Sequence, residues 1–72
     1  MKPDARIDSL WKVVADPKAD TLDRILATER LRTELRALEY RIVAEARSQG
    51  ATWAEIGHSL GLTKQAAYAR YS

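Results

Sequence analysis

The longest stretch of the chain without a glycine or a proline runs from Thr21 to Gln49. Glycine and proline are the residues that most readily interrupt a helix, so this stretch predicts one long central helix. At 1.5 Å per residue such a helix is about 44 Å long, which exceeds the width of a domain made from 72 residues. Part of its apolar surface therefore needs a neighbour, which either the chain itself or a partner has to supply.

Two apolar patches lie on this helix, and they face different directions at about 100° per residue. The first comprises Leu22, Ile25 and Leu26. Either it holds a preceding helix, or the long helix bends near Thr28. The second patch is a stripe formed by Leu31, Leu35, Leu38, Ile42 and Ala46. The stripe can pack against a second chain, as in a coiled coil, or against the last two helices of the same chain. Both contacts can also occur, each on a different part of the stripe.

A short amphipathic helix is expected before the long one. Its apolar face, at helical spacing, consists of Ile7, Leu10, Trp11 and Val14. Trp11 is therefore expected in the core. Pro17 ends this helix because proline lacks an amide donor and disfavours helix at the residue before it. Asp20 is then suited to cap the start of the long helix.

Two further short helices are expected at the C-terminal end. Gly50 closes the long helix, and Thr52 with Glu55 forms a capping box at the start of the next one. Gly61 supplies a tight turn, and Thr63 caps a last helix that runs over 64–71. The predicted fold is all-α: a short N-terminal helix, a long central helix and a C-terminal helix-turn-helix.

Small and apolar residues are placed to pack the last two helices together. Ile56, Leu60 and Leu62 supply the apolar contacts, and Gly57 is small where the two segments approach closely. Ala66 and Ala67 are expected on the inner side of the last helix, and Trp53 is expected to cover the junction with the long helix.

Composition excludes several classes of function. The chain has no cysteine and one histidine, His58, so a disulfide framework and a zinc cage are excluded. No serine elbow or glycine-rich phosphate loop is present, and the acidic residues do not converge. We therefore expect no enzyme, no cofactor and no small-molecule substrate.

The sequence also bears on location. No apolar run approaches the roughly 20 residues of a membrane span. The segment from Met1 to Asp8 is charged and contains Pro3, unlike a signal peptide. A cytoplasmic protein without membrane contact is expected.

Residues 50–57, GATWAEIG, and 60–68, LGLTKQAAY, resemble the helix-turn-helix of small actinobacterial and phage DNA-binding proteins. The same segment is similar to the DNA-reading half of sigma-factor region four. The resemblance implies that residues 64–71 form a recognition helix in the major groove, while the preceding helix crosses the backbone. Arg70 departs from the pattern, in which that place is commonly aliphatic, and Tyr71 is expected to close the core instead.

The outward places of the motif are occupied by Thr63, Lys64, Gln65 and Tyr68. Glutamine pairs with adenine, and lysine donates to guanine or to phosphate. Thr52 and Thr63 at the helix starts are candidates for phosphate contacts, and Arg70 and His58 are secondary ones. The predicted function is thus sequence-specific binding of double-stranded DNA by a transcriptional regulator associated with the nucleoid.

Charge sets a limit on this function. Residues 51–72 contain two basic residues, Lys64 and Arg70, against one acid, Glu55, and the whole chain carries a net charge of only +2. One copy would neutralise few phosphates, so we expect a homodimer that reads two half-sites about 34 Å apart. Residues 1–49 would form the helical hairpin that dimerises, with the interface at Leu31, Leu35, Leu38 and Ile42, and residues 50–72 the reading unit.

The alternative function belongs to another class. An adaptor or antitoxin-like protein would use the Leu31–Ile42 stripe to bind a different protein, and its last two helices would serve only as a scaffold. A fragment of a larger factor is a third interpretation.

Overall fold

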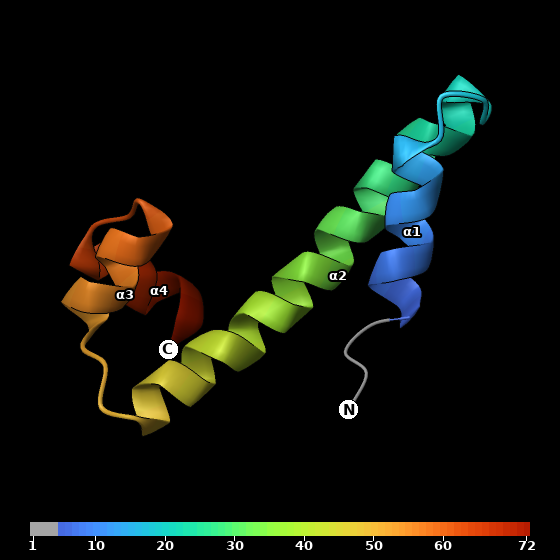
Figure 1. The fold of residues 1–72 in the computed structure, drawn as a ribbon. Helices are drawn as coiled ribbons and strands as arrows, with labels where there is room; N and C mark the ends of the chain where they lie inside the picture. The colour runs from blue at the N-terminus through green and yellow to red at the C-terminus, as the bar shows by residue number, and fades with distance from the viewer. Residues whose placement is uncertain (1–4) are drawn as a thin grey trace. The chain divides into compact units, whose positions relative to one another are not determined.

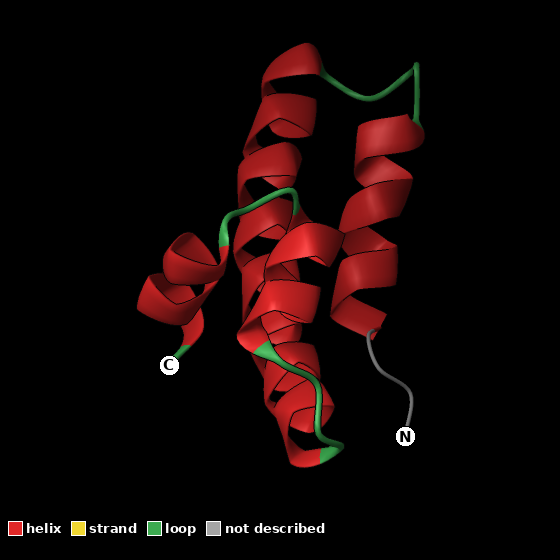
Figure 2. Cartoon of the chain, turned by 90° about the vertical axis from the view of Figure 1, so that its left-hand side faces the viewer, coloured by secondary structure: helices red, strands yellow, loops and turns green. Residues whose placement is uncertain are grey.

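The computed structural model describes residues 5–72, so Pro3 and the first part of the segment Met1–Asp8 lie outside the described residues. Four helices follow one another in this range: α1 (Ala5–Ala15), α2 (Thr21–Ser48), α3 (Trp53–Leu60) and α4 (Lys64–Tyr71) (Figure 1). Short loops connect the helices, and residues 5–72 contain no strand (Figure 2). The predicted all-α class is confirmed. Within the same residues, no helix is long and apolar enough to cross a membrane.

The chain divides into two compact units inside α2, at residues 1–37 and 38–72. The second unit therefore begins at Leu38, twelve residues before the start of the predicted DNA-reading unit, residues 50–72. The assignment of dimerisation to residues 1–49 and DNA reading to residues 50–72 stays a prediction.

In the first unit, α1 lies alongside the beginning of α2 (Figure 1). Asp20 caps α2 as expected, because its carboxylate accepts hydrogen bonds from the amides of Leu22 and Asp23 at 3.1 and 3.2 Å. Arg24 donates through Nε to the carbonyl of Val14 at 3.1 Å. Among the described residues of this unit, Ala27 is the one that is buried.

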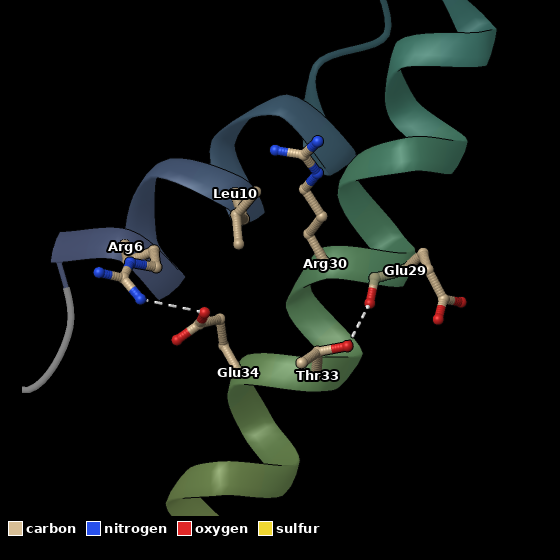
Figure 3. Close-up of a pocket in the computed structure, with 6 residues that line it drawn as sticks. All are labelled: Arg6, Leu10, Glu29, Arg30, Thr33 and Glu34. Atoms are coloured by element: carbon tan, nitrogen blue, oxygen red, sulfur yellow. Dashed lines mark hydrogen bonds and ion pairs between the residues drawn. The ribbon is translucent and has the colours of Figure 1, made fainter.

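A small hollow lies between α1 and α2 (Figure 3). Leu10 points into it from α1, and Arg6 reaches across to the carboxylate of Glu34 at 3.2 Å. No residue of α1 is buried. The contact between the two helices is therefore a narrow stripe.

Two expectations for this unit are wrong. Trp11 is 55% exposed and is not a core residue. It lies about 100° around α1 from Leu10, beyond the stripe that faces α2. The patch of Leu22, Ile25 and Leu26 does not hold α1 either, because all three side chains are exposed. Instead, α1 packs on the face of α2 that carries Ala27.

The second unit has a core of Val43, Ile56 and Ala67, one residue from each of α2, α3 and α4. Ala46, Ala51, Trp53, Leu60 and Tyr71 pack around it. Ala46, the last residue of the predicted apolar stripe, therefore packs against the core of its own chain. Ile42 is exposed, and Val43 takes the core position. One residue step turns the direction by about 100°, and α3 and α4 pack on the side of Val43.

Candidate nucleic-acid interface

The start of α3 is held by the predicted capping box. The backbone at Thr52 is extended, with φ −85° and ψ 160°, and its hydroxyl accepts from the amide of Glu55 at 3.1 Å. In return, the Glu55 carboxylate accepts from the Thr52 amide at 2.8 Å. The amides of Thr52 and Glu55, which would otherwise lack partners at the helix start, are thus both hydrogen-bonded.

This capping box affects the phosphate contact expected at Thr52. The Thr52 hydroxyl also donates to the Glu55 carboxylate at 3.1 Å. Hydrogen bonds from the backbone and side chain of Thr52 lower the pKa of Glu55, against a small opposing effect of burial. An ionised carboxylate therefore occupies the helix start. The side chain of Thr52 would have to leave Glu55 before it could donate to a phosphate.

The turn between α3 and α4 depends on two glycines. Gly61 adopts φ 71° and ψ 28°, a left-handed conformation that glycine accepts readily. The amide of Leu62 donates to the carbonyl of Gly57 at 2.7 Å. A Cβ on Gly57 would lie 2.8 Å from the carbonyl oxygen of Leu62 and 2.9 Å from that of Thr63. The expectation that Gly57 permits a close approach is confirmed, and the neighbour is the backbone of the turn.

Thr63 begins α4 as expected. Its backbone is extended, and its hydroxyl accepts from the amide of Ala66 at 3.0 Å. This bond uses the acceptor side of the hydroxyl and leaves its proton for another partner. Thr63 therefore differs from Thr52, because Thr63 can cap its helix and donate outward at the same time.

The surface of α4 is divided sharply into an inner and an outer side. Ala67 is fully buried and Tyr71 is half-buried, whereas Lys64, Gln65 and Tyr68 are all exposed. The first two turns of α4 thus present an ammonium, an amide and a phenol to the surroundings.

Two small residues share the outer side of α4. Ala66 was expected on the inner side, which is wrong: it is exposed, as is Ala69. Ala66 lies about 100° around the helix from Ala67, which is enough to take it out of the core. Ala69 was not predicted as an outward residue, although its spacing from Gln65, four residues earlier, was a signal for it.

Tyr68 is held in place by an aromatic neighbour. Its ring meets the ring of Trp53 edge to face, with 5.6 Å between centroids and an angle of 86°. The Arg47 guanidinium lies over Trp53, 4.8 Å from the ring centroid. The same guanidinium donates a hydrogen bond to the carbonyl of Ala51 at 2.8 Å. Trp53 thus packs against the end of α2, as predicted. This role of Arg47 was not predicted from the sequence.

Arg70 lies apart from the other predicted contact residues. It follows Tyr68 by two positions, or about 200° around α4. Its guanidinium lies 5.9 Å from the ring centroid of Tyr71. Its carbonyl accepts from the hydroxyl of Tyr40 at 3.0 Å. The structure therefore groups Thr63, Lys64, Gln65 and Tyr68 but does not add Arg70 to them.

Tyr71 closes the end of the unit, as expected. Its hydroxyl donates to the Glu39 carboxylate, and its ring lies 4.6 Å from that of Tyr40 between centroids. Burial raises the pKa of Tyr71, and the hydrogen bond to Glu39 raises it further, while Arg70 opposes both. The end of α4 is thus fastened to α2 by two tyrosines.

Comparisons with known proteins identify relatives but no activity. Three curated relatives, one from Mycobacterium bovis and two from strains of Mycobacterium tuberculosis, are each 39% identical to this chain over 70 residues and match 92% of it. All three are uncharacterized proteins. The chain spans about 28% of the length of these relatives. No model of a protein family and no solved structure matches the chain.

Proposed function

We propose that the chain binds double-stranded DNA in a sequence-specific manner, with α3 and α4 acting as a helix-turn-helix and α4 entering the major groove. One observation carries this proposal. Lys64, Gln65 and Tyr68 of α4 are all exposed, while Ala67 of the same helix is fully buried. A recognition helix requires this combination, because its position must be fixed by packing while its polar side chains stay available for base edges.

Each exposed group has a chemical role in this proposal. The Gln65 amide matches the N6 and N7 pattern of adenine, and the Lys64 ammonium donates to guanine O6 or N7 or to a phosphate. The proton of the Thr63 hydroxyl is directed to a phosphate oxygen. Tyr68, supported by Trp53, contacts a base or a sugar. Thr52 and Arg70 are secondary phosphate contacts.

The proposed regulator acts as a homodimer at the nucleoid. Residues 38–72 have one more basic residue than acidic residues: Arg41, Arg47, Lys64 and Arg70 against Glu39, Glu45 and Glu55. With so little excess charge, one copy would make few favourable phosphate contacts and would bind weakly. Two copies double the contacts and read two half-sites.

A selection from random duplex DNA tests the proposal. Binding of the enriched duplex is then followed by fluorescence anisotropy at about 50 and 200 mM salt. The test variant is the double substitution Lys64→Ala/Gln65→Ala. Its matched control is Lys12→Ala/Gln49→Ala, which removes the same two side-chain types from exposed positions outside α4.

The expected result is a paired motif in the selected DNA, with binding lost in the test variant and kept in the control. Weak binding without a motif, equal in both variants, would overturn the proposal. Such a result would indicate only a general attraction between basic side chains and phosphates.

A second candidate function is supported by the exposure of Leu35 and Ile42 on α2. An adaptor or antitoxin-like protein would bind a different protein through the Leu31–Ile42 stripe. Leu35→Glu would then abolish that binding, whereas Lys64→Ala/Gln65→Ala would leave it unchanged. The same pair of variants, assayed on DNA and on a candidate partner, separates the two functions.

A further inference from the structure

The end of α2 brings a positive charge to the start of α3. The Arg47 guanidinium lies over the Trp53 ring, 4.8 Å from its centroid, and donates a hydrogen bond to the carbonyl of Ala51 at 2.8 Å. The side chain is nevertheless exposed, and it makes no ion pair with a carboxylate among residues 5–72. An unpaired positive charge is therefore held in a defined position beside the first residue of α3.

The two contacts of Arg47 fix its guanidinium without using all of its donors. Arginine carries several N–H groups, and the hydrogen bond to Ala51 is the one that Arg47 makes within the described residues. The contact with the Trp53 ring is electrostatic and needs no hydrogen-bond acceptor. Contacts of this kind at the surface add little stability. Their main effect is to reduce the freedom that the side chain would lose on binding an anion.

The start of α3 needs a positive charge if it is to meet DNA. In a helix-turn-helix, the first of the two helices crosses the sugar-phosphate backbone. Thr52, the residue expected to contact a phosphate there, donates its hydroxyl proton to the ionised Glu55 carboxylate. A carboxylate repels a phosphate and has no proton to donate to it. Arg47 can supply both the charge and the N–H groups that are missing at this place.

Tyr68 links this charge to the proposed recognition helix. Its ring contacts the same indole as Arg47 does, with 5.6 Å between the centroids of Tyr68 and Trp53. Its exposed phenol is proposed to contact a base or a sugar. Because sugars and phosphates alternate along a DNA strand, a strand that reaches Tyr68 brings a phosphate into the neighbourhood of Trp53 and Arg47.

We propose that Arg47 contacts a backbone phosphate of DNA, so that the end of α2 belongs to the binding surface together with α3 and α4. The guanidinium donates two parallel N–H···O hydrogen bonds, the geometry that arginine favours with phosphate oxygens. This inference rests on the proposed function and extends it from the reading of bases to the positioning of the backbone. Arg47, rather than Thr52, is then the main phosphate contact at the start of α3.

The salt dependence of DNA binding tests the inference on the full chain. Affinity for the selected duplex is measured by fluorescence anisotropy between about 50 and 200 mM salt. Arg47→Gln removes the charge and should weaken binding about tenfold at the lower salt. It should also reduce the slope of log K against log salt by about one unit. Arg47→Lys keeps the charge but loses the paired N–H groups, so it should retain the slope while binding more weakly.

Arg41→Gln is the matched control for Arg47→Gln. It removes the same charge from an exposed position in the same helix and the same unit. Its affinity and its salt slope should equal those of the wild type. Thermal unfolding of each variant, followed by circular dichroism, identifies the conditions under which all of them are folded, and binding is compared under those conditions.

Uncharged phosphate analogues locate the contact on the DNA. Methylphosphonate groups, which lack the negative charge, are placed one at a time along the selected duplex. The wild type and Arg41→Gln should lose affinity at one position in each half-site where Arg47→Gln shows no further loss, because partners in contact are not additive. A loss in Arg47→Gln that equals the wild-type loss at every position would overturn the inference, since the charge of Arg47 would then have no phosphate partner.

Two further results overturn the inference and leave the proposed function in place. If Arg47→Gln binds the selected duplex as the wild type does, Arg47 has no part in the complex. If its affinity falls by the same factor at every salt concentration, Arg47 acts only by holding Trp53 and, through it, Tyr68. A wild-type chain that enriches no motif removes the proposed function itself, and the inference with it.

Discussion

Gly57 and Leu62 contact each other through their backbones. The Leu62 amide donates to the Gly57 carbonyl at 2.7 Å, and a Cβ on Gly57 would lie 2.8 Å from the Leu62 carbonyl oxygen. No side-chain rotation relieves such a contact, because both partners belong to the main chain. This pair therefore sets how closely the turn before α4 approaches α3.

We expect Gly57→Ala to lower the free energy of unfolding by about 1–3 kcal/mol, the usual cost of overpacking. The turn must move away from α3 to accept the methyl group. Urea denaturation followed by circular dichroism measures the change. Ser59→Ala, at an exposed position in the same helix, is the control and should have little effect. Equal stability of Gly57→Ala and the wild type would contradict the close contact.

The capping box predicts a loss of stability in acid. The folded-state pKa of Glu55 is lowered by its hydrogen bonds to Thr52. The stabilisation is therefore complete above the pKa of the unfolded state, and it is lost as pH falls through the folded pKa. The melting temperature of the wild type should fall more on acidification than that of Glu55→Gln. Glu45→Gln, which removes an exposed carboxylate from α2, should keep the wild-type profile.

Removal of the Tyr40 hydroxyl should loosen the end of α4. Tyr40→Phe deletes the hydrogen bond to the Arg70 carbonyl and should cost about 0.5–1.5 kcal/mol, towards the lower value because the bond is exposed. Hydrogen exchange should speed up at the last amides of α4. Tyr68→Phe is the control, since the Tyr68 hydroxyl makes no hydrogen bond within residues 5–72. Unchanged exchange in Tyr40→Phe would show that this bond does not restrain the helix end.

The two polar residues at the start of α4 should affect DNA binding in different ways. Gln65→Ala should cost about 1–3 kcal/mol on the selected sequence and relax the preference at one base pair, because a base contact is lost. Lys64→Ala, if its contact is to a phosphate, should weaken binding to all sequences alike and reduce the salt dependence by about one unit. Anisotropy titrations on the selected duplex and its single-base variants distinguish the two. Identical profiles for both variants would contradict the separate roles.

Sequence reasoning succeeded wherever a feature depends on residues close together in the chain. The caps at Asp20, Thr52 and Thr63 and the left-handed turn at Gly61 were all predicted correctly. Each of these features is made by hydrogen bonds or torsion angles within three or four residues of its own position. The order of the helices follows from the same local pattern. Whether α4 reads DNA remains a prediction.

The direction in which each helix packs was decided only by the tertiary structure. Val43 rather than Ile42 enters the core, and Ala66 faces outward. Exposed apolar residues are Trp11, Leu22, Ile25 and Leu26. The physical reason is the helical period. A helix with apolar residues on several sides offers several faces to a neighbour, and one residue step of about 100° exchanges interior for surface. The sequence alone therefore determined where the helices begin and end, while the approach of neighbouring helices determined which of their faces became the core.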